Sequence, residues 1–395
     1  MPSTPSPPDF DPQIRSDPWG WWRKKMPITE KWAYLDHAAV GPLSMPAAAA
    51  LRNYADEAER EGDTVWPTWA GRVETLRHAF AELLHAETDE VCFVPNTSAG
   101  INLVAEGFPW QSGDSVVIPD GEFPSNLYPW QNQASRGVEV RIVPRRDGRV
   151  EPEDLFEHVD ESTRMISLSW VGYASGFRAD LEAIIQRAHA QGVLVFLDAI
   201  QGLGVFDLDL QKIDVDFLAA DGHKWLLGPE GYGVAVIRKR HLERLRCCSV
   251  GWNSVRNTFN YAEPKLDLRR TAARFEPGSA NMSAAAALGA SVAMFNMIRQ
   301  THGPNAIGDR VLALATELDD RLRAVGLPTQ IPSKRQHRSG IVTFGVPGQD
   351  PAAVRNRAIE QGCVVSCRGG GIRAGVHAYN DSSDLERLVD AVAST

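Results

Sequence analysis

The chain has 395 residues, of which 43% are hydrophobic, so it can bury a core large enough for one large domain and a smaller one. Its formal net charge of −9 and pI of about 5.6 argue against nucleic acid as a partner. No run of about 18 apolar residues occurs, so the sequence predicts no membrane-spanning helix. The N-terminus has no signal-peptide core, and we expect a cytoplasmic protein.

The cysteines do not form a disulfide or metal pattern. Five are present, Cys92, Cys247, Cys248, Cys363 and Cys367, and their spacing is too irregular for a disulfide framework. Neither a paired CxxC nor an HExxH motif occurs, so a zinc site of either type is unsupported. We interpret Cys247 and Cys248 as two thiols at a helix end, with redox activity as the alternative.

Residues 1–30 form an arm that is rich in proline and then in tryptophan. Trp19, Trp21 and Trp22 follow the prolines closely. A free tail rarely carries three tryptophans, because their large apolar rings favour burial. We therefore expect the arm to pack on another surface, such as a second subunit.

A long alternation of apolar runs and amphipathic segments follows two helical segments at 45–61 and 68–86. The apolar runs are VCFVP (91–95), SVVIPD (115–120), VEVRIV (138–143), RMISLS (164–169), VLVFLD (193–198), VDFLAAD (215–221) and GVAVI (233–237). The amphipathic segments include 98–108, 125–136, 152–158 and 180–191. Such crossovers predict an α/β fold with a mostly parallel seven-stranded sheet covered on both faces.

The C-terminal third predicts two long helices and then a smaller βαβ-like unit. The helices are expected at 283–300 and 305–324, the short strands at 340–346, 363–367 and 371–376, and further helices at 351–361 and 382–393. We divide the chain into an arm (1–30), a large domain (31–280), and linking helices with a small C-terminal α/β domain (281–395).

Three motifs lie at predicted strand ends, where open parallel sheets bind ligands. In VFLDAIQ (195–201), Asp198 ends an apolar strand and Gln201 follows three residues later. A carboxylate in that place needs a partner, because an unpaired buried charge costs several kcal/mol. Alternatively, Asp198 caps a following helix.

The second motif, VDFLAADGHKW (215–225), brings His223 and Lys224 to the same edge, unless the lysine reaches solvent from a loop. In the third, FVPNTSAGINLVA (93–105), Thr97 and Ser98 open a helix. Free N–H groups and the helix dipole make such a start an anion site. Ordinary N-capping is the alternative.

A buried acid, an enclosed lysine and a phosphate cradle on one sheet edge are what pyridoxal 5′-phosphate (PLP) requires. The lysine forms a Schiff base, the acid keeps the pyridine nitrogen protonated, and the helix start holds the phosphate. GLGVFD (202–207) contains only a broken glycine fingerprint, so nicotinamide binding is weakly supported. We expect PLP as the cofactor and no metal.

At these motifs the chain resembles the class V aminotransferase family of fold-type I PLP enzymes, which includes cysteine desulfurases and isopenicillin N epimerase-like proteins. The resemblance extends from YLDHAAVGPLS (34–44) to GIRAGVHAYN (371–380). It implies Lys224 as the Schiff-base lysine and Asp198 on the pyridinium nitrogen. The cofactor ligands that it further implies are Gln201 on the ring hydroxyl and Thr97, Ser98 and His223 on the phosphate.

The resemblance also implies three contacts beyond these motifs. Phe123, in DGEFPSN, falls where the family stacks an aromatic or histidine ring on the cofactor. Ser279, in RFEPGSAN, falls where the family reaches the phosphate of the neighbouring subunit, which implies a homodimer. Arg373 falls where the family holds the substrate α-carboxylate, to which a guanidinium fork is suited.

Three departures separate the chain from the cysteine desulfurases that it resembles. Desulfurases carry a histidine where this chain has Phe123, and an asparagine near the ring hydroxyl where it has Tyr173. They also have a mobile loop with a persulfide-forming cysteine before the substrate arginine, an interval that here is only CRGGGIR. We expect Cys367, at the end of the preceding strand, to lie out of reach of a substrate sulfur.

Two residues beside Lys224 lack a clear cofactor role. Many relatives have a serine or threonine on the phosphate where this chain has Asp221. A second anion beside phosphate is repulsive, so we expect Asp221 to turn away or a protonated His223 to offset its charge. Trp225 is expected to pack under the lysine.

We expect a PLP-dependent enzyme that acts at Cα of an α-amino acid, with Lys224 moving the Cα proton. An epimerase or a C–S (cysteine or cystine) lyase is favoured over a class V aminotransferase or a cysteine desulfurase. A PLP-fold binding protein without catalysis is the alternative from another class. The substrate and the reaction type stay open at this point.

Overall fold

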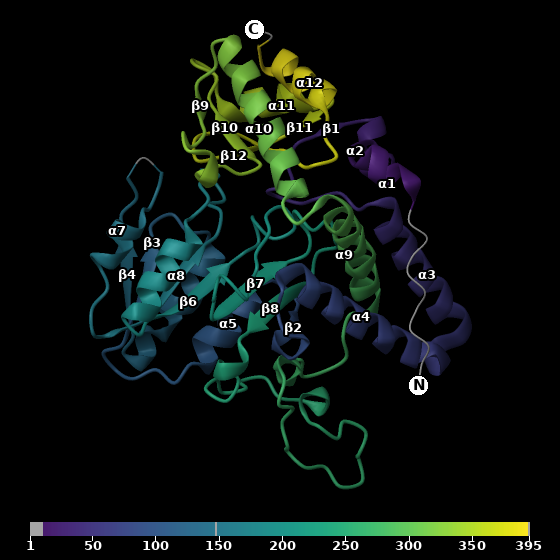
Figure 1. The fold of residues 1–395 in the computed structure, drawn as a ribbon, viewed down its shortest axis with the longest axis vertical. Helices are drawn as coiled ribbons and strands as arrows, with labels where there is room; N and C mark the ends of the chain where they lie inside the picture. Colours follow the sequence, from purple (N-terminus) through teal and green to yellow (C-terminus); the bar gives the residue numbers. More distant parts are fainter. Residues whose placement is uncertain (1–10, 147, 394–395) are drawn as a thin grey trace.

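A seven-stranded sheet forms the centre of the larger part of the molecule (Figure 1). This computed structural model describes residues 11–146 and 148–393; the first residues of the proline-rich arm, 1–10, lie outside these ranges. The strand order is β2-β8-β7-β6-β5-β3-β4. The strands are β2 (Val91–Val94), β3 (Ser115–Pro119), β4 (Glu139–Val143), β5 (Thr163–Ser169), β6 (Leu194–Asp198), β7 (Phe217–Asp221) and β8 (Gly233–Ile237). Only β8 runs antiparallel to its neighbours, so the predicted mostly parallel α/β sheet is confirmed.

Apart from the partly exposed edge strand β4, both faces of this sheet are buried, because alternate side chains of the strands enter two different cores. Leu197 and Leu218 point into one core, whereas Phe196 and Phe217 point into the other. The helices on the first face include α4 (Trp66–Leu84), α8 (Leu181–Ala190) and α9 (Met282–His302), and α5 (Thr97–Gly107) lies on the second. Strands that are buried on both faces are continuously apolar, which is why the sequence showed runs without alternation.

Helix α5 packs unusually close to β7. A Cβ on Gly100 would lie 2.5 Å from the Cβ of Ala219, so only glycine permits this approach. The close packing brings the N-terminus of α5 to the carboxyl ends of β6 and β7, where Asp198 and Asp221 lie. A ligand can therefore bind at this carboxyl edge of the sheet, beside the N-terminus of α5.

One predicted helix, 125–136, is wrong. The structure instead has η4 (Pro124–Asn126), α6 (Tyr128–Gln131) and η5 (Asn132–Arg136). Pro124 and Pro129 both lie in the first turn of their segment. Because proline has no N–H to donate and favours the first turn of a helix, Pro124 starts a first short helical segment and Pro129 starts a second one.

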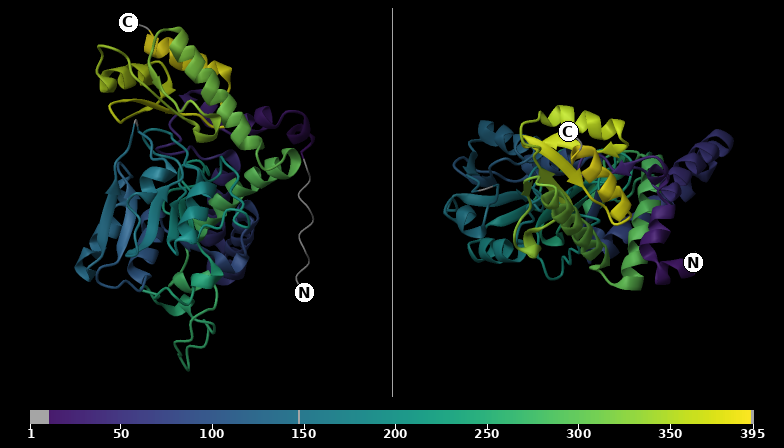
Figure 2. Two further views of the ribbon diagram at one scale, coloured as in Figure 1. Left: turned by 60° about the vertical axis from the view of Figure 1, so that its left-hand side comes forward. Right: turned by 90° about the horizontal axis from the view of Figure 1, so that it is seen from above.

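The C-terminal part has its own core and a four-stranded sheet stacked at one end of the larger body (Figure 2). The strand order is β12-β13-β10-β9, with β9 (Thr329–Gln330), β10 (Ile341–Phe344), β12 (Ser366–Arg368) and β13 (Gly371–Gly375). Its helices are α10 (Ala306–Ala324), α11 (Pro351–Glu360) and α12 (Ser382–Ala393). All three strand pairs are antiparallel, so β10 and β12, which flank β13, run parallel to each other. Because α11 connects these two strands, they form a split version of the predicted βαβ-like unit.

The predicted strand at 363–367 divides between two sheets. Its first half, β11 (Cys363–Val364), pairs in parallel with β1 (Ala33–Tyr34), and its second half joins the small sheet as β12. The partner of β11 lies near the other end of the chain, so local periodicity could not reveal this pairing. The pairing anchors the start of the large domain to the small sheet.

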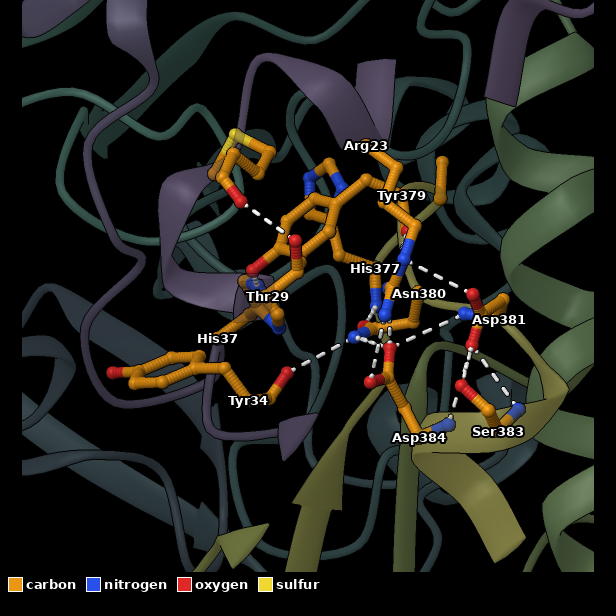
Figure 3. A network of polar contacts seen from close by, with 12 residues as sticks. Arg23, Thr29, Tyr34, His37, His377, Tyr379, Asn380, Asp381, Ser383 and Asp384 are labelled. Atoms are coloured by element: carbon orange, nitrogen blue, oxygen red, sulfur yellow. Dashed lines mark hydrogen bonds and ion pairs between the residues drawn. The ribbon is translucent and has the colours of Figure 1, made fainter. Parts of the chain in front are cut away.

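The tryptophan-rich arm packs on its own chain. It forms α1 (Pro12–Ser16) and α2 (Pro18–Lys24), and Trp22 is fully buried with its ring 4.8 Å from that of Phe295 on α9. Arg23 bonds Asp384 at 2.7 Å and Asp381 at 3.0 Å, at the start of α12 (Figure 3). A second subunit is therefore not what covers Trp22. Tryptophan burial was predictable, but its partner was not.

Helix α9 is long and apolar enough to cross a membrane by length and composition alone, and no other described helix is. Just over half of its apolar window is buried against the rest of the chain, and it packs along α4 and α3 (Met45–Glu61). The core helix of a soluble protein satisfies the same test, so this feature is weak evidence for a membrane.

Asp216, at the amino end of β7, gathers three basic side chains far from the carboxyl edge. His189 and His241 approach its carboxylate at 2.8 and 2.7 Å, and Arg240 at 2.7 Å. Burial alone would raise the pKa of Asp216, but these hydrogen bonds and one from the N–H of Val195 hold it well below its ordinary value. The carboxylate in turn raises the pKa of His189.

The His189 pair predicts a pH-dependent stability. Because its folded pKa is raised above about 6.5, protonated His189 stabilises the protein fully below that pH, and the contribution is lost as pH rises through the folded pKa. We expect His189→Gln to lower the free energy of unfolding by about 1 kcal/mol at pH 5.5 and by less at pH 9. Urea unfolding at both pH values measures this, with His78→Gln as the surface control. A difference from wild type that grows with pH would contradict the prediction.

Candidate active site

A cavity of about 330 Å³ opens at the carboxyl edge of the large sheet, beside the start of α5 and the small sheet. Every predicted site residue except Ser279 lines it: Thr97, Ser98, Phe123, Tyr173, Asp198, Gln201, His223, Lys224 and Arg373. Ser279 is exposed and lies outside this cavity. Motifs far apart in the sequence thus meet in one place, although the cavity alone does not test the role of each residue.

Lys224 and Asp198 are enclosed rather than solvated. Burial lowers the pKa of Lys224 and raises the pKa of Asp198, and the charge of each opposes the shift of the other. The Asp198 carboxylate accepts a bond from the N–H of Ile200 at 3.1 Å, and no helix follows β6 directly. The alternatives of a surface lysine and a helix-capping aspartate are therefore wrong.

The first turn of α5 places two hydroxyl groups at the cavity, of which that of Ser98 donates to Ser125 at 2.7 Å. Asn96, not Thr97 or Ser98, caps the helix by accepting from the N–H of Ala99 at 2.9 Å. Thr97 accepts from the N–H of Asp221 at 2.9 Å, which leaves its own hydroxyl hydrogen available. The alternative of ordinary capping by Thr97 or Ser98 is wrong, and this helix start can bind an anion.

Trp225 does more than pack under the lysine. Its indole N–H donates to the side-chain carbonyl of Gln201 at 2.7 Å, and the Gln201 amide donates to the backbone oxygen of Ala38 at 3.0 Å. Both polar ends of Gln201 are thus held, and one amide hydrogen is left for a ligand. A buried tryptophan nearly always needs such a partner, but the sequence did not indicate which one.

Arg373 is fixed by a network that links the two parts of the chain. It is only 2% exposed, and its guanidinium donates to the backbone oxygen of Tyr173 at 2.8 Å and to Ser366 at 3.2 Å. Asp36 lies 3.4 Å from it and accepts from Ser366 at 2.8 Å. Burial raises the pKa of Asp36, which Ser366 and Arg373 oppose. The sequence did not predict that Ser366 and Asp36 contact Arg373, because neither residue lies in the motif that contains Arg373.

Phe123 offers a platform for a flat ligand. It is 43% exposed on the cavity, with the Lys224 amine 5.7 Å from its ring and Tyr173 packed edge-on at 5.3 Å. An aromatic face, a buried amine, a buried acid and a helix N-terminus together match the four parts of PLP. The residues present therefore fit that cofactor.

Five further polar residues that line the cavity were not predicted: Asn96, Ser125, Ser169, Glu230 and Arg368. Arg368 lies directly before the three glycines of CRGGGIR, five residues from Arg373. A second arginine so near the expected substrate arginine was the one sign in the sequence that Arg368 lines the site. No group of three or more histidine, cysteine or acidic residues is arranged for a metal in the described part of the chain.

The cysteines lie away from the chemistry. Cys367 is half-buried on β12, does not line the cavity, and donates to the backbone oxygen of Pro351 at 3.2 Å. Cys247 donates to the backbone oxygen of Arg274 at 3.3 Å, and burial raises the pKa of both thiols. Both are thus less reactive than an ordinary thiol.

Asp221 does not turn away from the cavity, contrary to one of the two expectations. It is 5% exposed, lines the cavity, and its carboxylate lies 3.1 Å from Nδ1 of His223. The expected contact of His223 with the phosphate therefore has to be explained together with the neighbouring Asp221 carboxylate.

An enclosed lysine and an acid at the carboxyl edge of a mostly parallel sheet, below an aromatic platform and beside a helix start, define a fold-type I PLP enzyme. The sequence matches the Aminotransferase class-V family over residues 33–388, so the chain belongs to that family and its cofactor is PLP. It is 31% identical, over 93% of this chain and 95% of the relative, to a probable cysteine desulfurase of Methanothermobacter thermautotrophicus.

Solved structures share the fold. A cysteine desulfurase from Thermococcus onnurineus NA1 is 24% identical, with a TM-score of 0.84 over 94% of this chain and 96% of that one. The cystine C–S lyase C-DES, in complex with its reaction product cysteine persulfide, is 22% identical, with a TM-score of 0.86 over 93% of this chain and 99% of that one. These likenesses support the fold-type I architecture predicted from the sequence.

Proposed function

We propose that the protein is a C–S lyase that acts on a cysteine- or cystine-like α-amino acid. The observation that carries this proposal is that no cysteine among the described residues lines the cavity and that Cys367 donates to the backbone oxygen of Pro351. Sulfur released from a substrate then has no protein thiol to accept it. Relatives named cysteine desulfurase and a structural neighbour named cystine C–S lyase support sulfur-containing substrates.

PLP, when bound, supplies an aldehyde that condenses with amines and a ring that withdraws electrons. We assign Asp198 to the ring nitrogen, Gln201 to the ring hydroxyl, Phe123 to the ring face, and the α5 start with His223 to the phosphate. These assignments rest on where the side chains lie around the cavity. They also explain why so many polar groups converge on one small space.

The remaining residues bind substrate and move a proton. Arg373 would hold the α-carboxylate, with Tyr173 at its side. Because burial lowers the pKa of Lys224, its neutral amine is accessible for taking the Cα proton. Loss of that proton and departure of the β-sulfur with its bonding electron pair convert cysteine and water into pyruvate, ammonia and hydrogen sulfide.

One assay separates the candidate reactions. The PLP-loaded protein is incubated with L-cysteine, L-cystine and other L-amino acids in D₂O. Pyruvate with sulfide or persulfide in solution supports the lyase, and Cys367→Ser is expected to release sulfur as fast as wild type. Deuterated, racemised amino acid would instead indicate an epimerase, and pyridoxamine phosphate a transaminase. Sulfane sulfur bound to Cys367 would refute the proposal in favour of a desulfurase.

An epimerase is the second candidate, because Tyr173 provides another ionisable hydroxyl at the cavity. Epimerisation needs a second proton donor besides Lys224, and Phe123 cannot serve. A binding protein without catalysis is excluded if any of these products forms.

Arg373→Lys is expected to raise KM for the amino acid by about tenfold or more, because an ammonium cannot replace a fixed guanidinium fork. The visible band of bound PLP should persist. Steady-state kinetics and absorbance measure both effects, and Arg335→Lys, at an exposed ion pair with Asp309, is the matched control. An unchanged KM would remove Arg373 from the substrate site.

We also propose a homodimer in which Ser279 reaches the cavity of the second copy. Ser279 is exposed outside the cavity of its own chain, and the position matches the family's intersubunit phosphate ligand. Sedimentation of the PLP-loaded protein tests this, and a monomer at assay concentration would refute it.

A further inference from the structure

Asp221 and His223 form a buried pair that the proposed chemistry does not yet use. The Asp221 side chain is 6% exposed and that of His223 is 16% exposed. Oδ1 of Asp221 and Nδ1 of His223 lie 3.1 Å apart, at ion-pair distance, and neither atom has a hydrogen-bond partner among the described residues. A buried polar atom without a hydrogen bond is strongly disfavoured, so we infer that a small rotation of the ring, which aligns Nδ1–H with Oδ1, satisfies both atoms.

The backbone holds this pair rigidly beside the helix start. The N–H of Asp221 donates to Thr97 at 2.9 Å, and the backbone oxygen of His223 accepts from the N–H of Gly41 at 2.7 Å. A Cβ on Gly41 would lie 2.2 Å from the backbone oxygen of Lys224, so this contact admits only glycine. The backbone that carries the imidazole is therefore fixed between Gly41 and the first turn of α5.

The pairing decides which ring nitrogen is available to a ligand. With Nδ1 against a carboxylate, the proton of that nitrogen is committed to Asp221. Nε2 is then the nitrogen that can serve the cavity, which His223 lines together with Thr97 and Ser98. When one ring nitrogen of a histidine binds a ligand, a carboxylate that accepts from the other nitrogen commonly sets the tautomer and the orientation of the ring.

We propose that Asp221 is a positioning residue that orients His223 toward the phosphate of PLP. The proposal rests on PLP binding at this cavity and adds a role for this chain's own acid. A serine or threonine at position 221 donates to the phosphate directly, which a carboxylate cannot do. Asp221 instead acts on the phosphate indirectly, by orienting the imidazole of His223.

The charge of Asp221 fits this arrangement. The carboxylate is paired with an imidazole, and the N–H of the same residue bonds the Thr97 hydroxyl, so Asp221 does not face the phosphate alone. It also raises the pKa of Lys224, against burial and the charges of Arg373 and Arg368. Removing the carboxylate is therefore expected to loosen the phosphate contact rather than relieve a repulsion.

The test compares PLP with pyridoxal, which lacks the phosphate. PLP-free protein is titrated with each compound, for wild type, Asp221→Ala, Asp221→Asn and the control Glu230→Gln, which removes one negative charge from the same cavity. We expect Asp221→Ala to weaken PLP binding about tenfold and to leave pyridoxal binding unchanged. Asp221→Asn should retain most of the affinity, because its carbonyl still accepts from Nδ1–H, and Glu230→Gln should leave the ratio of affinities unchanged.

Nitrogen-15 NMR of the histidine rings, with His223 assigned by its absence in His223→Gln, gives a second readout. Nδ1 of His223 should be protonated in wild type and Asp221→Asn, and this state should be lost in Asp221→Ala. Equal or tighter PLP binding by Asp221→Ala would overturn the inference, as would an equal loss of PLP and pyridoxal, which indicates a purely structural role. A wild-type protein that binds no PLP would instead refute the proposed function on which the inference rests.

Discussion

Lys224→Ala is expected to lower kcat by about 1,000-fold or more, because it removes the amine assigned both to hold the cofactor and to move the Cα proton. Neighbouring groups can stabilise substrate charge, but none of the other lining residues offers a buried amine beside Asp198. The loss should appear in kcat and in kcat/KM together, since the amine acts in the transition state.

The same variant should still bind PLP, because the helix start, Asp198 and Phe123 remain. Its visible band should no longer be fixed by borohydride to the protein, whereas the wild-type band is. Lys212→Ala, at an exposed ion pair with Asp209, is the control and should behave as wild type. A borohydride-fixed chromophore that persists in Lys224→Ala would show that another residue forms the Schiff base. Unchanged thermal unfolding excludes loss of the fold as the cause.

The parts of the fold that the sequence predicted well are those with a local cause. The run VFLDAI is apolar without alternation because both faces of β6 are buried, and Asp198 stands out because it ends that run. Lys224 and the Thr97–Ser98 turn are recognisable for the same reason. Each is a polar break immediately after a buried strand, and parallel strands bring such breaks to one edge.

The parts that the sequence did not predict depend on contacts between distant segments. The pairing of β1 with β11, the burial of Trp22 against α9 and the bond from Trp225 to Gln201 are of this kind. A local sequence pattern does not identify the strand with which another strand pairs or the acceptor of an indole N–H. Only the arm's need for a surface was evident, because large aromatic rings favour burial.

The two parts of the molecule meet at residues 36–41. Asp36 contacts Arg373, and His37 binds the backbone oxygen of Gly375 at 2.7 Å and the Tyr379 hydroxyl at 2.6 Å (Figure 3). Complete burial holds the pKa of His37 well below its ordinary value, so this tie stays neutral at physiological pH. The expected substrate arginine on the small sheet is thus held in register with the lysine loop of the large one.

Arg77→Ala is expected to lower the free energy of unfolding by about 3–5 kcal/mol, the largest stability effect that we anticipate. Arg77 is buried on α4 and donates to both carboxylate oxygens of Glu276, at 2.6 and 3.0 Å, and to the backbone oxygen of Val91 at 2.9 Å. Glu276 is itself only 12% exposed and also accepts from the N–H of Phe93. Removing the arginine leaves the buried carboxylate of Glu276 without its counter-charge and takes the guanidinium donor away from the Val91 carbonyl.

A second arginine of the same helix is the matched control. Arg72 bonds Glu57 at 2.6 Å, but both side chains are about a third exposed, so Arg72→Ala should cost about 1 kcal/mol or less. Adding Glu276→Gln to Arg77→Ala should restore part of the stability, because the unpaired buried charge is then gone. Denaturant unfolding of the four proteins measures these differences. If Arg77→Ala and Arg72→Ala lower the free energy of unfolding equally, the Arg77–Glu276 pair does not stabilise the contact between β2 and the segment that contains Glu276.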